Sequence, residues 1–207
     1  MIIIDNVAQG SEEWFGLKLG KPSSSNFSKI LTAKGRDSAT AERYMFDLAM
    51  ERVTGKKKDG FKSAAMENGN EMEPESRRFY EFKHNCDVDQ VAVVFKNDKK
   101  LFLCSPDGLI RNKKAGLELK NVEDFTQWGY IQNPDSLVAK YHRQLQGSLF
   151  ITGYDYWDIM SYNPNLDPVE VRVYPNLDFH DILQVKLERF CAELDELTAR
   201  IKALSEY

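Results

Sequence analysis

Ser105-Pro106-Asp107-Gly108, followed by Glu118-Leu119-Lys120 eleven positions after the aspartate, is the stretch that decides how this chain folds. Proline and glycine favour a turn, and the apolar residues at 109–110 and 117–119 form short strand-like runs. The polar segment 111–116 between them ends in glycine. This spacing predicts a β-hairpin.

The register of that hairpin decides which side chains meet. A turn centred near residues 113–114 would place position 107 opposite 120 and position 109 opposite 118. Asp107, Glu118 and Lys120 would then project from one face of the sheet. Glu118 and Lys120 share a face in any register, because side chains alternate along a strand. A slip of one residue would separate Asp107 from them.

The converging carboxylates predict a metal-dependent phosphodiesterase site. Mg²⁺ takes oxygen ligands, keeps several waters and leaves positions for phosphate oxygens. Lys120 beside it would orient the nucleophile and offset developing charge. Alone, Ser-Pro-Asp-Gly is a common turn sequence, and the alternation at 118–120 is typical of any half-exposed strand. Together, at hairpin spacing, they indicate function.

The composition suits a single α/β domain over residues 1–207, with 42% hydrophobic and 29% charged residues. A net charge of −4 argues against a general nucleic-acid coat but not against a DNA enzyme with a local basic surface. The start lacks a signal peptide and no run is long enough to span a membrane, so we expect a cytoplasmic protein without a membrane partner. Cys86, Cys104 and Cys191 indicate neither disulfides nor a zinc site.

Helical and strand periodicities give an order of elements along the chain. The predicted helices lie near residues 11–20, 23–31, 38–54, 63–82, 123–131, 135–152 and 178–204. The predicted strands lie near 88–96, 100–104, 155–162 and 169–174, in addition to the hairpin. The first two of these strands and the hairpin predict an antiparallel meander.

The chain resembles the restriction-endonuclease-like nucleases, whose signature is Pro-Asp, a gap, then Asp/Glu-x-Lys. It is most similar to the lambda-exonuclease type of phage recombination nuclease, the YqaJ-like viral recombinase family. The resemblance implies a restriction-endonuclease-like core, with a central mixed sheet and an antiparallel meander flanked by helices. The segments that carry it are residues 14–25, 69–73, 105–120 and 144–148.

The resemblance also implies roles for individual residues. Asp107, Glu118 and the backbone carbonyl of Leu119 would bind the metal, with Glu73 as an additional acid near it. Lys120 would position the attacking water. The remaining implied roles are a hydrogen bond from Gln146 near the scissile phosphate and a grip on the terminal 5′-phosphate by Lys18, Ser25 and Ser105. The type member has arginine where this chain has Lys18, and lysine cannot form a bidentate fork.

The activity implied is that of a Mg²⁺-dependent exodeoxyribonuclease, with Mn²⁺ as a substitute. It would degrade double-stranded DNA 5′ to 3′ from its ends and leave 3′ single strands. A ring-shaped homotrimer and a partner single-strand annealing protein are implied with it, in a host cytoplasm if a phage encodes the chain. Two alternatives stay open: a restriction-like endonuclease or junction resolvase of the same fold, and a catalytically silent DNA-binding phage protein.

Overall fold

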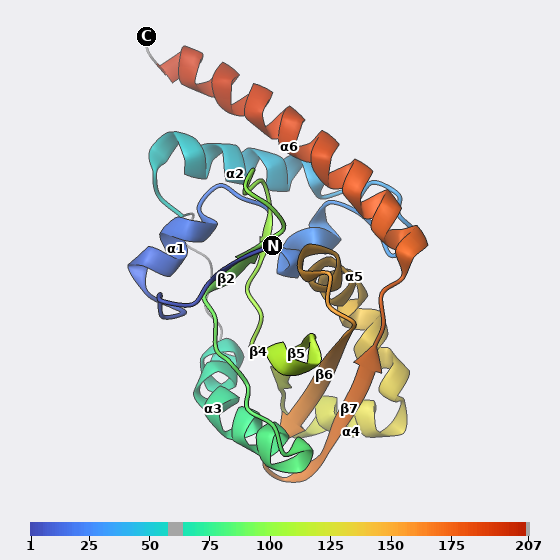
Figure 1. Ribbon diagram of the computed structural model, residues 1–207. Coiled ribbons are helices and arrows are strands. Elements are labelled where there is room, and N and C mark those ends of the chain that lie inside the picture. The colour runs from blue at the N-terminus through green and yellow to red at the C-terminus, as the bar shows by residue number, and fades with distance from the viewer. Residues whose placement is uncertain (58–63, 206–207) are drawn as a thin grey trace.

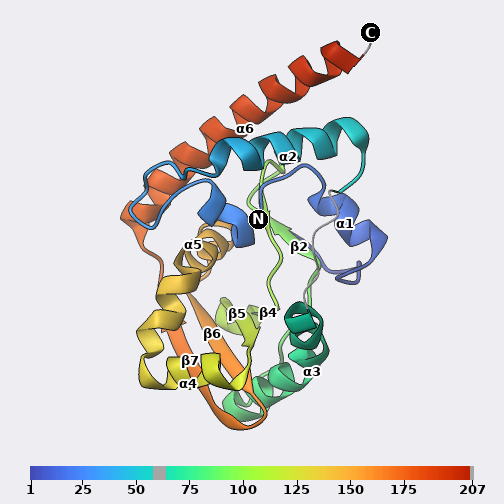
Figure 2. The ribbon, with the colours of Figure 1, turned by 180° about the vertical axis from the view of Figure 1, so that it is seen from behind.

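The computed structural model describes residues 1–57 and 64–205, with side chains described at 1–57 and 71–204. Figures 1 and 2 show helices packed around two sheets, as the α/β prediction requires. The helices agree with the predicted ranges to within a few residues, except that an unpredicted 3₁₀ turn forms at Arg111–Lys113 in the hairpin connection. They are α1 (Glu12–Lys18), η1 (Ser24–Lys29), α2 (Ala41–Thr54), α3 (Ala64–His84), η2 (Arg111–Lys113), α4 (Asp124–Gln132), α5 (Pro134–Thr152) and α6 (Leu177–Ser205).

The strands form a three-stranded and a four-stranded sheet within the described ranges. The first is antiparallel and has the order β1 (Ile2–Ile4), β2 (Val93–Phe95), β3 (Leu103–Cys104). The second has the order β4 (Gly108–Ile110), β5 (Ala115–Asn121), β6 (Tyr156–Asn163), β7 (Leu166–Val173). Because β5 and β6 are parallel and the other pairs antiparallel, this sheet is mixed.

The predicted meander is divided between these two sheets, and β1 was not predicted. β2 pairs with the amino-terminal isoleucines on one side, with Ile3 opposite Val94, and with β3 on the other, and this sheet does not continue into the hairpin. An isolated antiparallel β-bridge between Asp89 and Leu109 connects the predicted strand at 88–96 to the hairpin. Three consecutive isoleucines show no alternation of polar and apolar residues, so their pairing depends on a partner far along the chain.

The hairpin forms, but its register differs by two residues from the prediction. Gly108 pairs with Leu117 and Ile110 with Ala115, so continuing the register places position 107 opposite 118. The connection is a 3₁₀ turn ending at Lys114, whose backbone is left-handed (φ 46°). A shift of two residues keeps each side chain on its face, which is why the three site residues still meet.

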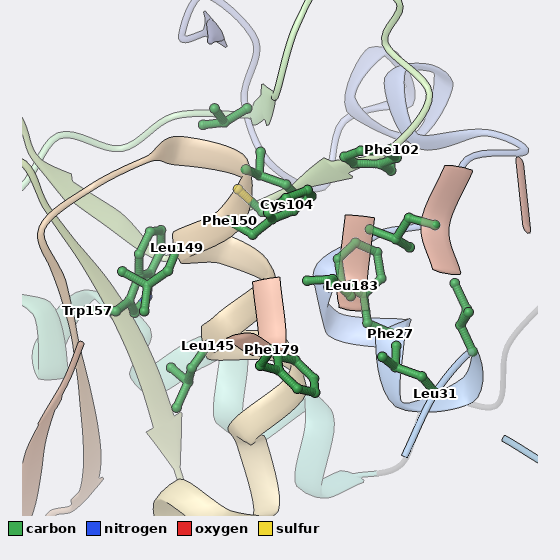
Figure 3. Packing of buried hydrophobic residues seen from close by; sticks show 14 of the residues in the cluster. Phe27, Leu31, Phe102, Cys104, Leu145, Leu149, Phe150, Trp157, Phe179 and Leu183 are labelled. Carbon is green, nitrogen blue, oxygen red and sulfur yellow. The ribbon is translucent and has the colours of Figure 1, made fainter. Parts of the chain in front are cut away.

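Helices cover both faces of the four-stranded sheet. α5 packs on one face, where Leu145 and Leu149 belong to the same apolar core as Trp157 (Figure 3). α3 packs on the other face, where Tyr80 joins a core with Leu117. The polar residues of β5 that face α5 therefore lie between a sheet and a helix, which removes them from bulk water.

The elements before the hairpin approach α5 closely. A side chain at position 147 would put its Cβ 2.5 Å from the Phe27 ring, so glycine there lets η1 lie against the helix. α2 and α6 cross above this layer, and α6 projects beyond it (Figure 2).

Cys104 and Cys191 are buried free thiols and Cys86 is partly exposed. No helix in the described part of the chain has the length and hydrophobicity to cross a membrane.

Candidate active site

Asp107 immediately precedes β4. Because β5 extends past this end of β4, the part of β5 after Leu117 has no antiparallel neighbour on this side among the described strands. Asp107 Oδ2 accepts a hydrogen bond from the main-chain N–H of Leu119 at 2.7 Å. In an extended strand the N–H and C=O of one residue point to the same side. The Leu119 carbonyl therefore faces the same open edge as Asp107, which brings a main-chain oxygen toward the carboxylates.

Glu118 is almost fully buried between β5 and α5, at 2% exposure. Its Oε1 accepts hydrogen bonds from Lys120 Nζ at 2.5 Å and from Gln144 Nε2 at 2.6 Å. Burial, and then the charge of Asp107, raise the pKa of Glu118 to about 7. A cation that binds between two buried carboxylates stabilises their charged forms, because it offsets their mutual repulsion.

Lys120 supplies one such cation. Burial opposes its charge, but Glu118 and Asp107 outweigh that effect and raise the pKa of Lys120 above its ordinary value. Its Nζ also lies 4.7 Å from the centre of the Tyr141 ring on α5. At neutral pH Lys120 is therefore a fixed positive hydrogen-bond donor beside the carboxylates and not a general base.

Glu73, on α3, lies close enough to Asp107 for the two charges to interact. Burial, and then Asp107, raise the pKa of Glu73. Its carboxylate accepts a charge-assisted hydrogen bond from Arg77, one helical turn later. The predictions from sequence missed Arg77, although four-residue spacing between opposite charges on a helix is a recognisable signal.

The donor set fits Mg²⁺, which proteins hold through one or two carboxylates together with other oxygens and water. Asp107, Glu118 and the Leu119 carbonyl offer such a set at one sheet edge. Among the residues whose side chains are described, no group of three or more acidic, His or Cys side chains stands together as a metal cluster. In this conformation Glu73 is ion-paired with Arg77.

Gln146 does not lie at this site. It is buried at 3% exposure, and its Nε2 donates to the Tyr174 carbonyl at 2.9 Å while its Oε1 accepts from the main-chain N–H of Asn176 at 2.9 Å. These bonds fasten α5 to the segment before α6. Gln144 reaches Glu118 instead, because residues two apart on a helix point in nearly opposite directions.

The predicted 5′-phosphate residues are only partly brought together. Lys18 is half-buried, lies 3.9 Å from the centre of the Trp14 ring, and lines a cavity of about 370 Å³. Burial, and then the charge of Lys57, lower the pKa of Lys18 to about 8. The cavity is also lined by three other lysines, two acids and two polar side chains: Lys21, Lys29, Lys57, Asp47, Glu51, Ser23 and Asn26.

The two serines predicted beside Lys18 have other partners. Ser105 Oγ donates to the Ala92 carbonyl at 2.7 Å and accepts from Trp14 Nε1 at 3.1 Å. Because a hydroxyl has one hydrogen to donate, Ser105 has none left for a phosphate in this arrangement. Ser25 is exposed and its Oγ lies 3.0 Å from that of Ser23, which lines the cavity in its place.

A larger cleft of about 680 Å³ lies between the amino-terminal segment and α3. Its walls include Glu73 and Arg77, together with Trp14 and the amides of Gln9 and Gln90. The Gln9 amide donates to the main-chain carbonyls of Val91 and Pro106, at 2.8 Å and 2.9 Å. The cleft therefore gives solvent access to Glu73 and Arg77.

The sequence matches the family model of the YqaJ-like viral recombinase domain over residues 13–155. The chain belongs to this family. Membership supports a nuclease role in recombination. A search of curated proteins gives no match.

Solved structures agree with this family and with the restriction-endonuclease-like fold. The chain is similar to an alkaline exonuclease, LHK-Exo from Laribacter hongkongensis, at 26% identity and a TM-score of 0.84, over 95% of this chain and 98% of that one. LHK-Exo in complex with dAMP matches with the same values. A phage-related exonuclease from Haemophilus somnus 129PT shares the fold, at 14% identity and a TM-score of 0.71, over 87% and 96% of the two chains.

Proposed function

We propose that this chain is a Mg²⁺-dependent exodeoxyribonuclease that degrades double-stranded DNA 5′ to 3′ from its ends. It would leave 3′ single strands for annealing during recombination. The observation that carries the proposal is the meeting of Asp107, Glu118 and Lys120 at the open edge of β5. A family that includes recombination nucleases, and the likeness to an alkaline exonuclease, support the same activity.

Asp107, Glu118 and the Leu119 carbonyl would hold the ion. A bound divalent ion supplies polarisation of the phosphate and a water of lowered pKa. Lys120, kept charged by its two acidic neighbours, donates a hydrogen bond to the attacking water or to the phosphate oxygen that gains charge. Gln144 orients Glu118 from the helix side by the hydrogen bond at 2.6 Å.

Recognition of the 5′ end is proposed at the cavity beside Lys18. Four lysines line it and two acids balance part of their charge. No hydrogen bond or ion pair engages the Lys18 ammonium among the described residues, so it is available to an anion. Lysine offers a point charge, so we expect a moderate preference for 5′-phosphate over 5′-hydroxyl.

A trimer and a single-strand annealing partner belong to the proposal through the family alone. A ring around the duplex would explain how an exonuclease remains on its substrate. Analytical ultracentrifugation at micromolar concentration tests the trimer directly, and a monomer there would contradict it. Pull-down with a purified annealing protein tests the partner, with bovine serum albumin as the negative control.

The activity itself is tested on two duplexes of the same sequence, one linear and one covalently closed. With Mg²⁺ we expect the linear duplex, labelled at its 5′ end, to release label first, and the closed circle to stay intact. EDTA should stop the reaction, and Mn²⁺ should restore it. Cleavage of the closed circle would favour the endonuclease alternative, and binding without cleavage would favour the silent DNA-binding protein.

A further inference from the structure

Arg77 joins three segments that meet beside the site. Its residue is 8% exposed, and its guanidinium donates to the Glu73 carboxylate one turn earlier on α3. Nε and Nη2 also donate to the main-chain carbonyl of Asp107, at 3.3 Å and 3.2 Å. With the Gln90 amide oxygen turned toward it, the guanidinium donates there too, at 2.7 Å and 3.0 Å.

Asp107 is consequently held at both ends. Arg77 fixes its main chain, and the Leu119 N–H fixes its carboxylate. A rigid planar fork with several donors suits this task, because it can bond a carboxylate and a carbonyl at the same time. The direction in which Asp107 presents its second oxygen therefore depends on a residue of a different element, thirty positions earlier in the chain.

The charges around the site give Arg77 a second effect. Three acids lie here: Glu73, Asp107 and Glu118. Among the residues with described side chains, Arg77 is ion-paired with Glu73 and Lys120 with Glu118. Arg77 thereby offsets the charge of Glu73.

We propose that Arg77 is a positioning residue that withholds Glu73 from the metal-binding pair while it holds the main chain of Asp107. The site then binds its divalent ion more weakly than three free acids would, but with Asp107 in the orientation that cleavage requires. This inference rests on the proposed function. Substitution of Arg77 is expected to change Mg²⁺ affinity and kcat in opposite directions, whereas loss of a purely structural contact would lower both.

The decisive variant is Arg77→Met, titrated with Mg²⁺ in the absence of DNA by calorimetry. We expect Mg²⁺ to bind at least about fivefold tighter, because three carboxylates then face one cation. We expect kcat on linear duplex to fall at least about tenfold, because Asp107 loses its main-chain anchor. A variant that is merely damaged would bind the ion more weakly and cleave more slowly.

Further variants isolate the cause. Arg77→Met combined with Glu73→Gln should return Mg²⁺ affinity to about the wild-type value, because the freed acid is then absent. Arg77→Lys keeps the charge without the fork, so its Mg²⁺ affinity should stay near wild type while kcat remains low. Arg78→Met removes the exposed neighbour on the same helix and should change neither quantity. Thermal unfolding of each variant checks that it is folded.

Unchanged or weaker Mg²⁺ binding by folded Arg77→Met would overturn the inference, as would tighter binding that persists in the double variant. If Arg77→Met does not fold, Arg77→Lys decides, and a wild-type kcat there overturns the inference. Failure of the proposed function is visible in the wild-type protein alone, as absence of Mg²⁺ binding and of cleavage, and would remove the inference with it. Normal wild-type cleavage with a negative result for Arg77 overturns the inference alone.

Discussion

The carboxylate of Asp107 accepts a hydrogen bond from the main-chain N–H of Leu119, with 2.7 Å between the two atoms. The bond crosses the hairpin just before the first residue of β4, where β5 continues beyond its last pair with that strand. It turns one oxygen of Asp107 toward the strand and leaves the other for a ligand. The two carboxylates and a main-chain carbonyl thereby share one edge of the sheet.

Removing the charge of either carboxylate should stop cleavage without unfolding the chain. Asp107→Asn keeps an acceptor for the Leu119 N–H, and Glu118→Gln keeps the shape of the buried side chain. We expect kcat to fall at least about 1000-fold in each, because metal-dependent stabilisation of the phosphate is lost. Circular dichroism and DNA binding should stay as in the wild type. Asp98→Asn, at an exposed turn, is the matched control, and wild-type rates in Asp107→Asn would refute the assignment.

The two glutamines of α5 should separate activity from stability. Gln146→Leu removes the hydrogen bonds to Tyr174 and Asn176, so we expect the free energy of unfolding to fall by about 2 kcal/mol with kcat nearly unchanged. Gln144→Leu removes the bond to Glu118, so we expect kcat to fall about tenfold or more at nearly constant stability. Urea unfolding and single-turnover cleavage measure the two effects. The reverse pattern would restore Gln146 as the site glutamine.

Mg²⁺ affinity should depend on pH in the neutral range. Burial and Asp107 raise the pKa of Glu118 to about 7, so below that pH the carboxyl carries a proton that must leave before the ion binds. Affinity should therefore rise with pH through about 7 and level off above it, and at pH 6 it should be about tenfold weaker than the plateau. Calorimetry between pH 6 and 8.5 measures this. A constant Kd across that range would show that Glu118 is ionised throughout or is not a ligand.

Preference for a 5′-phosphate should weaken at alkaline pH. Burial and Lys57 lower the pKa of Lys18 to about 8, so the ammonium is present below that pH and lost as pH rises through it. The ratio of kcat/KM for 5′-phosphate and 5′-hydroxyl duplexes should fall over the same interval, since kcat/KM reports the free enzyme. Lys18→Arg should keep the preference at high pH, and Lys18→Ala should lose it at every pH. Equal digestion of both ends by the wild type would show that this cavity does not read the phosphate.

Local patterns were sufficient to predict the helices, the hairpin and the three residues at its centre. Glu118 and Lys120 share a face because strand side chains alternate, and no distant contact is needed for that. Asp107 joins them even though the predicted register was off by two residues, because an even shift preserves the face. The metal-site hypothesis therefore followed from the sequence, because it depended only on which face of the sheet each side chain occupies.

Tertiary structure decided everything that depends on partners far apart in the chain. It split the expected meander between two sheets, because the isoleucines at 2–4 compete for β2. It directed Gln144 and not Gln146 to Glu118, because the rotation of α5 about its axis is set by packing against the sheet. It gave the Ser105 hydroxyl to the Ala92 carbonyl and tied Glu73 to Arg77. Hydrogen bonds form between groups that packing brings together, and spacing along a sequence does not determine which groups those are.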